Sequence, residues 1–187
     1  EGEYQGKKII SEKIKFRVFL GTIYTAKPVV EKSQFQSLAS GLALDSAQKT
    51  GMSAALQTAQ AILETGWGQS VPVDKYTGKF SNNLFGIKGS GPAGSVTSNT
   101  WEEYNGTVFR IDADFRAYSN INQSWNDHKN LLLNAQRYSI FRDVMHDGTQ
   151  GAWALRRAGY ATDSQYPLKL INIINTYNLN QLDEKSF

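Results

Sequence analysis

The chain has 187 residues, of which 40% are hydrophobic and 20% are charged, a balance that argues against an intrinsically disordered protein. It has no cysteine, which excludes disulfides and a thiol nucleophile. The net charge of +3 comes from residues 1–32, with seven basic and four acidic residues, because residues 33–187 carry thirteen of each. That neutral main part argues against a cationic nucleic-acid surface, and no apolar run approaches the ~20 residues of a membrane span.

The first 32 residues form a segment of their own. Residues 13–20 alternate charged and apolar side chains, which predicts a short strand. Gly21, Pro28 and the pair at 31–32 then indicate a boundary near residue 32. We expect the main domain to cover residues 33–187, with segment 1–32 as the end of a preceding domain, a packed strand or a surface-binding arm.

Two helices are expected after this boundary. Apolar residues follow Ser33 at helical spacing, and Ser33 is a suitable N-cap. A second helix is predicted from about Ser53 to Thr65, with Gly66 as its stop. Residues 66–99 are rich in Gly, Ser, Asn and Pro, which indicates a long loop, and loops of this length inside a domain are usually functional.

The second half of the chain combines one hairpin with further helices. Asn105-Gly106 between β-prone runs predicts a hairpin within residues 101–118. The remaining hydrophobic patterns predict helices near residues 123–136, 140–145, 149–158 and 164–177. The expected fold class is therefore α+β, mainly α, with one β-hairpin.

Glu64 is the one charged residue near the end of the uncharged second helix. At 100° per residue from Leu56, Leu63 and Trp67 fall within about 20°, and Glu64 about 80° away, at the margin of the apolar stripe. Poor solvation there would raise the pKa of the carboxyl group, as a general acid at neutral pH requires. The spacing alone also fits a partly exposed helix-end glutamate without a catalytic task.

The hairpin offers a second carboxylate. A two-residue turn at 105–106 pairs Glu102 with Phe109 and Glu103 with Val108. Because side chains alternate between faces, we expect Glu102 to point inward and Glu103 to lie on the wet side. Two carboxylates in different environments are the minimum requirement for glycoside hydrolysis.

Four motifs together resemble glycoside hydrolase family 73, the N-acetylglucosaminidases of bacterial cell walls. They are AQAILETGWG at 59–68, NNLFGIKG at 82–89, the acidic hairpin ending in FRAY at 115–118, and GYATDSQYPLKL at 159–170. They occur in the family's order and span roughly residues 33–180. The resemblance implies a lysozyme-like fold and cleavage of the β-1,4 bond after N-acetylglucosamine in peptidoglycan.

The resemblance also assigns catalytic roles. Glu64 matches the family's catalytic acid, and Tyr160 matches a tyrosine of the cleft. Aligned on Asn105-Gly106, the acidic hairpin residue falls on Glu102, whereas matching the Glu-Tyr pair selects Glu103; the facing argument favours Glu102. Glu102 could activate a water for inversion, or the substrate's N-acetyl group, held by Tyr160, could attack with retention.

Four further residues are predicted to bind substrate. Amide and aromatic side chains suit the polar groups and the apolar faces of sugars, which favours Asn82, Asn83, Phe85 and Tyr118. Turn chemistry is an equal explanation for the asparagines, and core packing for Phe85.

We expect no metal and no cofactor, since His128 and His146 are the only histidines and neither belongs to a metal-type cluster. The expected partner is the peptidoglycan glycan strand, cut by a monomer that is secreted or wall-associated, with a phage or a flagellum as possible settings. Two alternatives remain: a muramidase or lytic transglycosylase on the same fold, and a non-catalytic wall-binding or assembly module.

Overall fold

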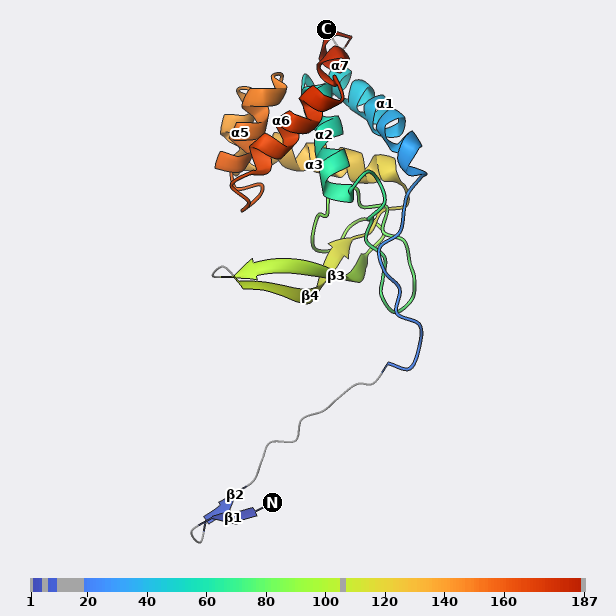
Figure 1. Cartoon of the computed structure of the whole chain (residues 1–187), viewed down its shortest axis with the longest axis vertical. Coiled ribbons are helices and arrows are strands. Elements are labelled where there is room, and N and C mark those ends of the chain that lie inside the picture. Colours follow the sequence, from blue (N-terminus) through green and yellow to red (C-terminus); the bar gives the residue numbers. More distant parts are fainter. Residues whose placement is uncertain (1, 5–6, 10–18, 105–106, 186–187) are drawn as a thin grey trace.

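The computed structural model describes residues 2–4, 7–9, 19–104 and 107–185, and it is mainly helical (Figure 1). A short antiparallel pair, β1 (Gly2–Tyr4) and β2 (Lys7–Ile9), precedes a helical body and one long hairpin. The helices are α1 (Lys32–Thr50), α2 (Ala54–Thr65), α3 (Ile121–Asn134), α4 (Ser139–Arg142), α5 (Gly148–Arg157), α6 (Tyr166–Thr176) and α7 (Asn180–Glu184), with a 3₁₀ turn at Gln136–Tyr138. In the described part of the chain, no helix combines the length and the apolar character that crossing a bilayer demands.

Helix α2 is the central element of the helical body. Ten of its twelve residues are buried, and α1, α5, α6 and α7 pack around it. Its many alanines let these neighbours approach closely, and their small side chains favour the helix itself. A polar side chain on α2 is consequently held in a fixed position by packing on most sides.

Both ends of α2 are defined by specific contacts. Ser53 caps the N-terminus by accepting from the Leu56 amide at 3.0 Å, and Asp183 of α7 accepts from the Ala55 amide at 3.0 Å. Gly66 ends the helix with a left-handed backbone (φ 54°). At Gly68 (φ 73°), a Cβ would lie 2.2 Å from the Phe35 ring, so no larger residue fits this turn.

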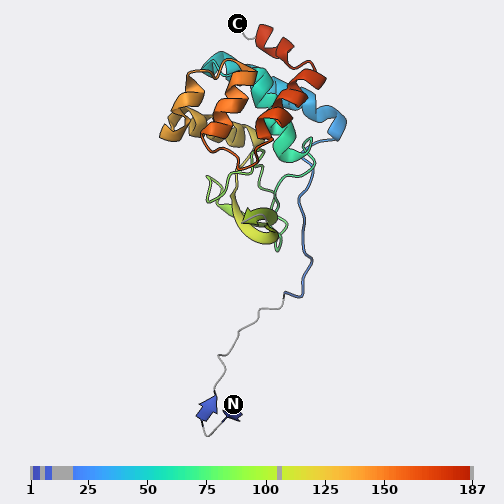
Figure 2. The ribbon, with the colours of Figure 1, turned by 60° about the vertical axis from the view of Figure 1, so that its left-hand side comes forward.

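The hairpin consists of β3 (Ser95–Tyr104) and β4 (Thr107–Arg116). Its register pairs Glu102 with Phe109 and Glu103 with Val108, as predicted. At its base, Val96, Phe115 and Ala117 form a small separate core. The two views agree that the helices gather on one side and the hairpin on the other (Figures 1 and 2).

Residues 24–29 run along the loop that follows α2. Lys27 and Val71 exchange two backbone hydrogen bonds of 3.0 Å, and the Tyr24 and Val29 amides donate to Lys75 and Gly68 at 2.9 Å. Val29 also packs against the main core. Part of the segment before residue 32 is therefore attached to the helical body along its backbone.

The fold class is confirmed, and several boundaries differ from expectation. The first helix begins at Lys32 with Glu31 as N-cap, so Ser33 is not the cap. The last predicted helix begins at Tyr166 and has no side-chain cap. Helix α7 was not predicted, since its five residues are too few for a periodic signal. The strand expected at 13–20 lies almost wholly outside the described residues, and 19–20 have no regular structure.

Candidate active site

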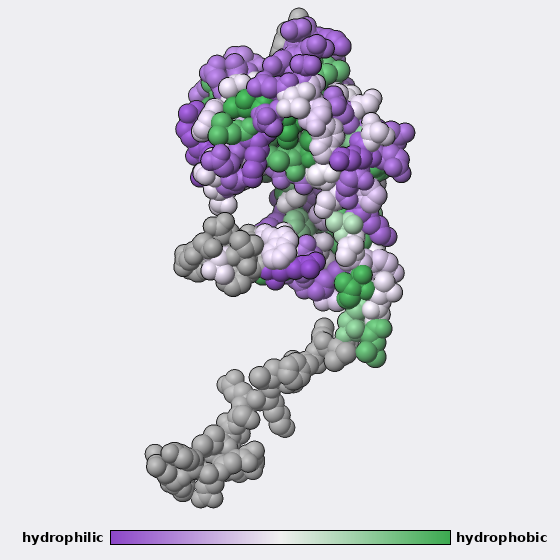
Figure 3. Space-filling view, viewed as in Figure 1, coloured by the Kyte–Doolittle hydropathy of each residue, from purple (hydrophilic) through white to green (hydrophobic). Residues whose placement is uncertain are grey.

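Two hollows meet at Glu64, near the C-terminal end of α2. Figure 3 shows the molecule indented below the helical body. The hollow on the helical side has a volume of about 600 Å³, and the hollow on the hairpin side about 290 Å³. Glu64, Phe85, Gly86 and Lys88 line both of them. Together they form one cleft that extends to either side of Glu64.

The carboxyl group of Glu64 is largely removed from water. Burial raises its pKa from 4.5 to about 7, against a smaller lowering effect of a hydrogen bond from Tyr166. The direction predicted from the apolar stripe is confirmed. Trp67 does not continue this stripe, because α2 ends at Thr65. It takes a left-handed backbone (φ 65°), and its ring contacts that of Tyr177, with 4.6 Å between the centroids.

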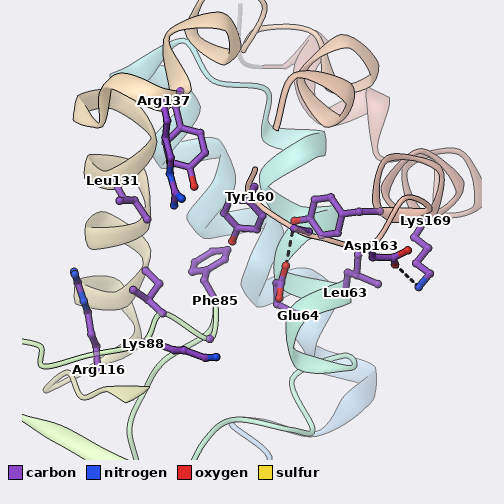
Figure 4. Close-up of a pocket in the computed structure, with 15 residues that line it drawn as sticks. Leu63, Glu64, Phe85, Lys88, Arg116, Leu131, Arg137, Tyr160, Asp163 and Lys169 are labelled. Carbon is purple, nitrogen blue, oxygen red and sulfur yellow. Dashed lines mark hydrogen bonds and ion pairs between the residues drawn. The ribbon is translucent and has the colours of Figure 1, made fainter. Parts of the chain in front are cut away.

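A short polar chain holds Glu64 in place, and the bond that reaches Glu64 is dashed in Figure 4. The Gln60 amide donates to the Tyr166 hydroxyl at 3.1 Å, and this hydroxyl donates to Glu64 Oε1 at 3.1 Å. Because Oε1 accepts this hydrogen bond as the better acceptor of the two oxygens, Oε2 is the oxygen available to carry the carboxyl proton. A protonated Glu64 can then donate from Oε2.

Tyr160 lies beside this chain in the wall of the larger hollow. Its ring centroid is 5.6 Å from that of Tyr166, and its hydroxyl lies 2.9 Å from His128 Nε2. Burial, with the charge of Glu64 as the next contribution, raises the pKa of Tyr160 well above 10, so its phenol stays protonated at neutral pH. The structure brings the predicted Tyr160 and Glu64 together in one cleft.

The asparagines predicted to bind sugar organise the loop that carries Phe85. Asn83 donates to the carbonyls of Ile87 and Arg116 at 2.9 Å, and is only 1% exposed. Asn82 adopts a left-handed backbone (φ 56°) and donates to the Tyr118 carbonyl at 2.8 Å. Phe85, 4% exposed, lines both hollows, and its ring stacks on that of His128 with 3.9 Å between the centroids. Asn83 also lines the smaller hollow.

Tyr118 is placed differently from the other predicted sugar contacts. It is 2% exposed, and its hydroxyl donates to Asp127 at 2.6 Å. The same carboxylate receives Arg116 at 2.8 Å. Among the described residues that line the two hollows, Arg116 is present and Tyr118 is not. The ion pair of Arg116 thus ties the end of β4 to α3.

The side chains of Glu102 and Glu103 lie outside the described part of the structure. The backbone places both on β3, three strand positions or fewer beyond Thr100. Ser98, Asn99 and Thr100 of the same strand line the smaller hollow.

Sequence reasoning missed several residues of the site. Gln60 lies four residues before Glu64, which puts both on neighbouring positions of the helix surface, a signal that was available. Tyr166 falls within the helix expected at 164–177, and that pattern predicts no catalytic role for it. The larger hollow also contains Lys88, Arg116, Arg137 and Lys169 (Figure 4). Within the described ranges, no three His, Asp or Glu side chains are grouped as metal ligands would be.

Comparison with known proteins assigns the family. Residues 40–179 match the glucosaminidase family described as mannosyl-glycoprotein endo-beta-N-acetylglucosaminidase. The chain belongs to this glucosaminidase family. The peptidoglycan hydrolase FlgJ of Escherichia coli K12 is 43% identical over 129 residues, which cover 68% of this chain and 41% of FlgJ. The exo-glucosaminidase LytG of Bacillus subtilis is 38% identical over 130 residues, covering 67% and 44% of the two chains.

Solved structures agree with this assignment. A peptidoglycan hydrolase mutant from Sphingomonas sp. A1 superposes with a TM-score of 0.67 at 36% identity, covering 82% of this chain and 99% of that one. The catalytic domain of the autolysin Auto from Listeria monocytogenes gives 0.66 at 33% identity, with 81% and 86% covered. This glucosaminidase chain therefore has a lysozyme-like α+β fold, and it spans less than half the length of the curated relatives it matches.

Proposed function

We propose that this glucosaminidase domain hydrolyses peptidoglycan by cutting the β-1,4 bond between N-acetylglucosamine and N-acetylmuramic acid. The observation that carries the proposal is the carboxyl group of Glu64. It has a pKa of about 7 and lies where the two hollows of the cleft meet. Relatives named peptidoglycan hydrolase, exo-glucosaminidase and autolysin support the substrate class. Wall-associated action outside the bacterial cell, as a monomer, belongs to the same proposal.

Glu64 acts as the general acid. Its Oε2 proton passes to the glycosidic oxygen while the bond from that oxygen to the sugar C1 breaks, and the leaving sugar keeps the proton as a hydroxyl group. The carboxylate left on Glu64 then lies near positive charge that develops at C1. Tyr166 stabilises this carboxylate by donating to Oε1.

Glu102 is the proposed second carboxylate. Successive strand residues alternate between faces, so position 102 shares the face of Ser98 and Thr100, which line the smaller hollow. Position 103 shares the face of Asn99 and Trp101, which are exposed, and of these two only Asn99 also lines that hollow. Glu102 activates the attacking water, or Tyr160 holds the substrate's acetamido group for attack at C1.

The test of the general acid is Glu64→Gln, assayed for release of soluble fragments from purified peptidoglycan. We expect the rate to fall by about 10²–10⁴, because the amide cannot supply the proton. Binding to sedimented walls should persist. Lysis by Glu64→Gln at the parent rate would exclude Glu64 as the acid. Binding to walls without any lysis by the parent protein would leave a wall-binding module as the function.

A matched pair tests the hairpin assignment. Glu102→Gln should lower the rate by at least about ten-fold, and Glu103→Gln by less than about two-fold, since the two positions face opposite sides of β3. The reverse ranking would select Glu103.

The fragments identify the bond. Reducing-end N-acetylglucosamine in the digest, found by mass spectrometry, supports the proposed specificity. Reducing-end muramic acid would indicate a muramidase, and an anhydro end a lytic transglycosylase.

A further inference from the structure

A buried polar pair lies directly behind Tyr160, on α3. His128 is fully buried and Lys129 is 3% exposed. Lys129 Nζ lies 2.9 Å from His128 Nδ1, and His128 Nε2 lies 2.9 Å from the Tyr160 hydroxyl. These two contacts connect a lysine in the core to a hydroxyl in the cleft wall through one imidazole ring.

The surroundings of Lys129 decide which groups donate and which accept in these two hydrogen bonds. Its Nζ lies over the Phe85 ring, 4.6 Å from the centroid, and over the Trp125 ring at 4.8 Å. The faces of aromatic rings are electron-rich, so they attract N–H hydrogens and repel a nitrogen lone pair. The nitrogen therefore meets three acceptors: two ring faces and His128 Nδ1. Burial lowers the pKa of Lys129 well below 10.5, whereas the two ring faces attract its ammonium form. The three hydrogens of the ammonium group match the three acceptors, and Lys129 donates to the imidazole.

The tautomer of His128 then sets the direction of its hydrogen bond to Tyr160. Burial, and then the charge of Lys129, lowers the pKa of His128 well below 6.5, so the ring is neutral and carries one N–H. With Nδ1 accepting from Lys129, that hydrogen must be on Nε2. Nε2–H consequently donates to the Tyr160 oxygen. The hydroxyl hydrogen of Tyr160 is left for the side of the cleft, where the Tyr166 hydroxyl is its hydrogen-bond partner and a substrate oxygen can take that place.

We propose that Lys129 and His128 are positioning residues that fix Tyr160 as a hydrogen-bond donor toward the substrate. The acceptor is an oxygen of the bound sugar, with the acetamido carbonyl as the group of suitable chemistry. Without Lys129, His128 can carry its hydrogen on Nδ1 and accept from Tyr160 instead, which turns the hydroxyl hydrogen away from the cleft. This inference rests on the proposed glycosidase function, because it assigns Tyr160 a task on the substrate.

The test is a double-mutant cycle with Lys129→Met and Tyr160→Phe, using soluble peptidoglycan glycan fragments. Lys129→Met should lower kcat about ten-fold with KM changed less than about two-fold, and Tyr160→Phe should lower kcat at least as much. The double variant should be no slower than Tyr160→Phe, because both changes remove one interaction. A parental kcat for Lys129→Met, or effects that multiply in the double variant, would overturn the proposal.

Stability measurements separate positioning from folding. Lys129→Met exchanges a buried amine for an apolar side chain of similar length, so Tm should stay at or above that of the parent while kcat falls. Thr58→Val, a buried isosteric change on a different helix, α2, should leave kcat within about two-fold. A fall in kcat in proportion to Tm in both variants would contradict the proposal.

A second pair of variants keeps the test decisive if Lys129→Met does not fold. The amide of His128→Gln reaches the position of Nε2 and can donate to Tyr160 without help from Lys129, whereas His128→Leu cannot. We expect His128→Gln to retain kcat within about three-fold and His128→Leu to lose about ten-fold or more. Equal losses in both would overturn the proposal. Activity of Glu64→Gln at the parent rate would instead overturn the proposed function, whatever the Lys129 variants do.

Discussion

At the scale of single residues, the proton on Glu64 determines the pH range of activity. A general acid works only while protonated, so kcat/KM should fall as the pH rises through about 7. Tyr166→Phe removes the hydrogen bond that lowers this pKa, which should move the alkaline limb about half to one pH unit upward. The measurement is a pH profile of kcat/KM on soluble glycan fragments.

The matched control for this change is Tyr138→Phe. It removes a buried hydroxyl from the same cleft that has no bond to Glu64 among the described residues. The alkaline limb of the kcat/KM profile of Tyr138→Phe should coincide with that of the parent protein. A limb of Tyr166→Phe that stays in place or moves to lower pH would contradict the assignment of the limb to Glu64.

Glu64 should also make the fold less stable as the pH rises. Its folded-state pKa of about 7 exceeds the 4.5 of the unfolded chain, so unfolding releases a proton between these values and stability falls through this window. Glu64→Gln lacks this loss. Relative to the parent, the variant should gain on the order of 2–3 kcal/mol in unfolding free energy between pH 4 and pH 8. Urea unfolding at both pH values measures it, and a difference that does not change with pH would refute it.

At the scale of elements, the catalytic helix depends on a helix 130 residues away in sequence. Asp183 of α7 accepts from Ser53 Oγ at 2.7 Å and from the Ala55 amide at 3.0 Å. A carboxylate at a helix N-terminus satisfies free amides and interacts favourably with the helix dipole. Asp183→Ala should therefore cost about 2 kcal/mol and lower Tm by about 4–8 °C, measured by thermal unfolding. The neighbouring Glu184→Ala should change Tm by less than about 2 °C, and equal shifts would show that the cap is unimportant.

Elements with local signals could be predicted from the sequence, and contacts between distant elements could not. Asn105-Gly106 determined the register of β3 and β4, and Ser53 and Gly66 determined the limits of α2. The raised pKa of Glu64 followed from the composition of its own helix. The bond from Tyr166 to Glu64, in contrast, depends on how α6 packs against α2, and no periodic pattern encodes that contact. The contact of Asp183 with the start of α2 likewise depends on how α7 packs against α2, and no periodic pattern encodes it.

At the scale of the whole molecule, the cleft continues past the catalytic carboxyl group in both directions. Glu64 lines the larger hollow beside α6 and the smaller hollow beside β3, so sugars can be held on both sides of the bond that is cut. An enzyme with such a cleft cuts within a strand, whereas one that works from the end needs a closed side. We infer an endo-acting enzyme.

Purified glycan strands of many disaccharides test this inference. In a time course followed by size-exclusion chromatography, the mean strand length should fall to about half before disaccharides exceed a few per cent of the product, because random internal cuts shorten strands first. Release of disaccharides from the earliest time points, with the remaining strands near full length, would show that one hollow does not bind sugar. The hairpin-side hollow can be tested in the same assay: Thr100→Trp fills it and should slow the cutting of long strands if this hollow binds sugar, whereas an unchanged rate would show that it does not.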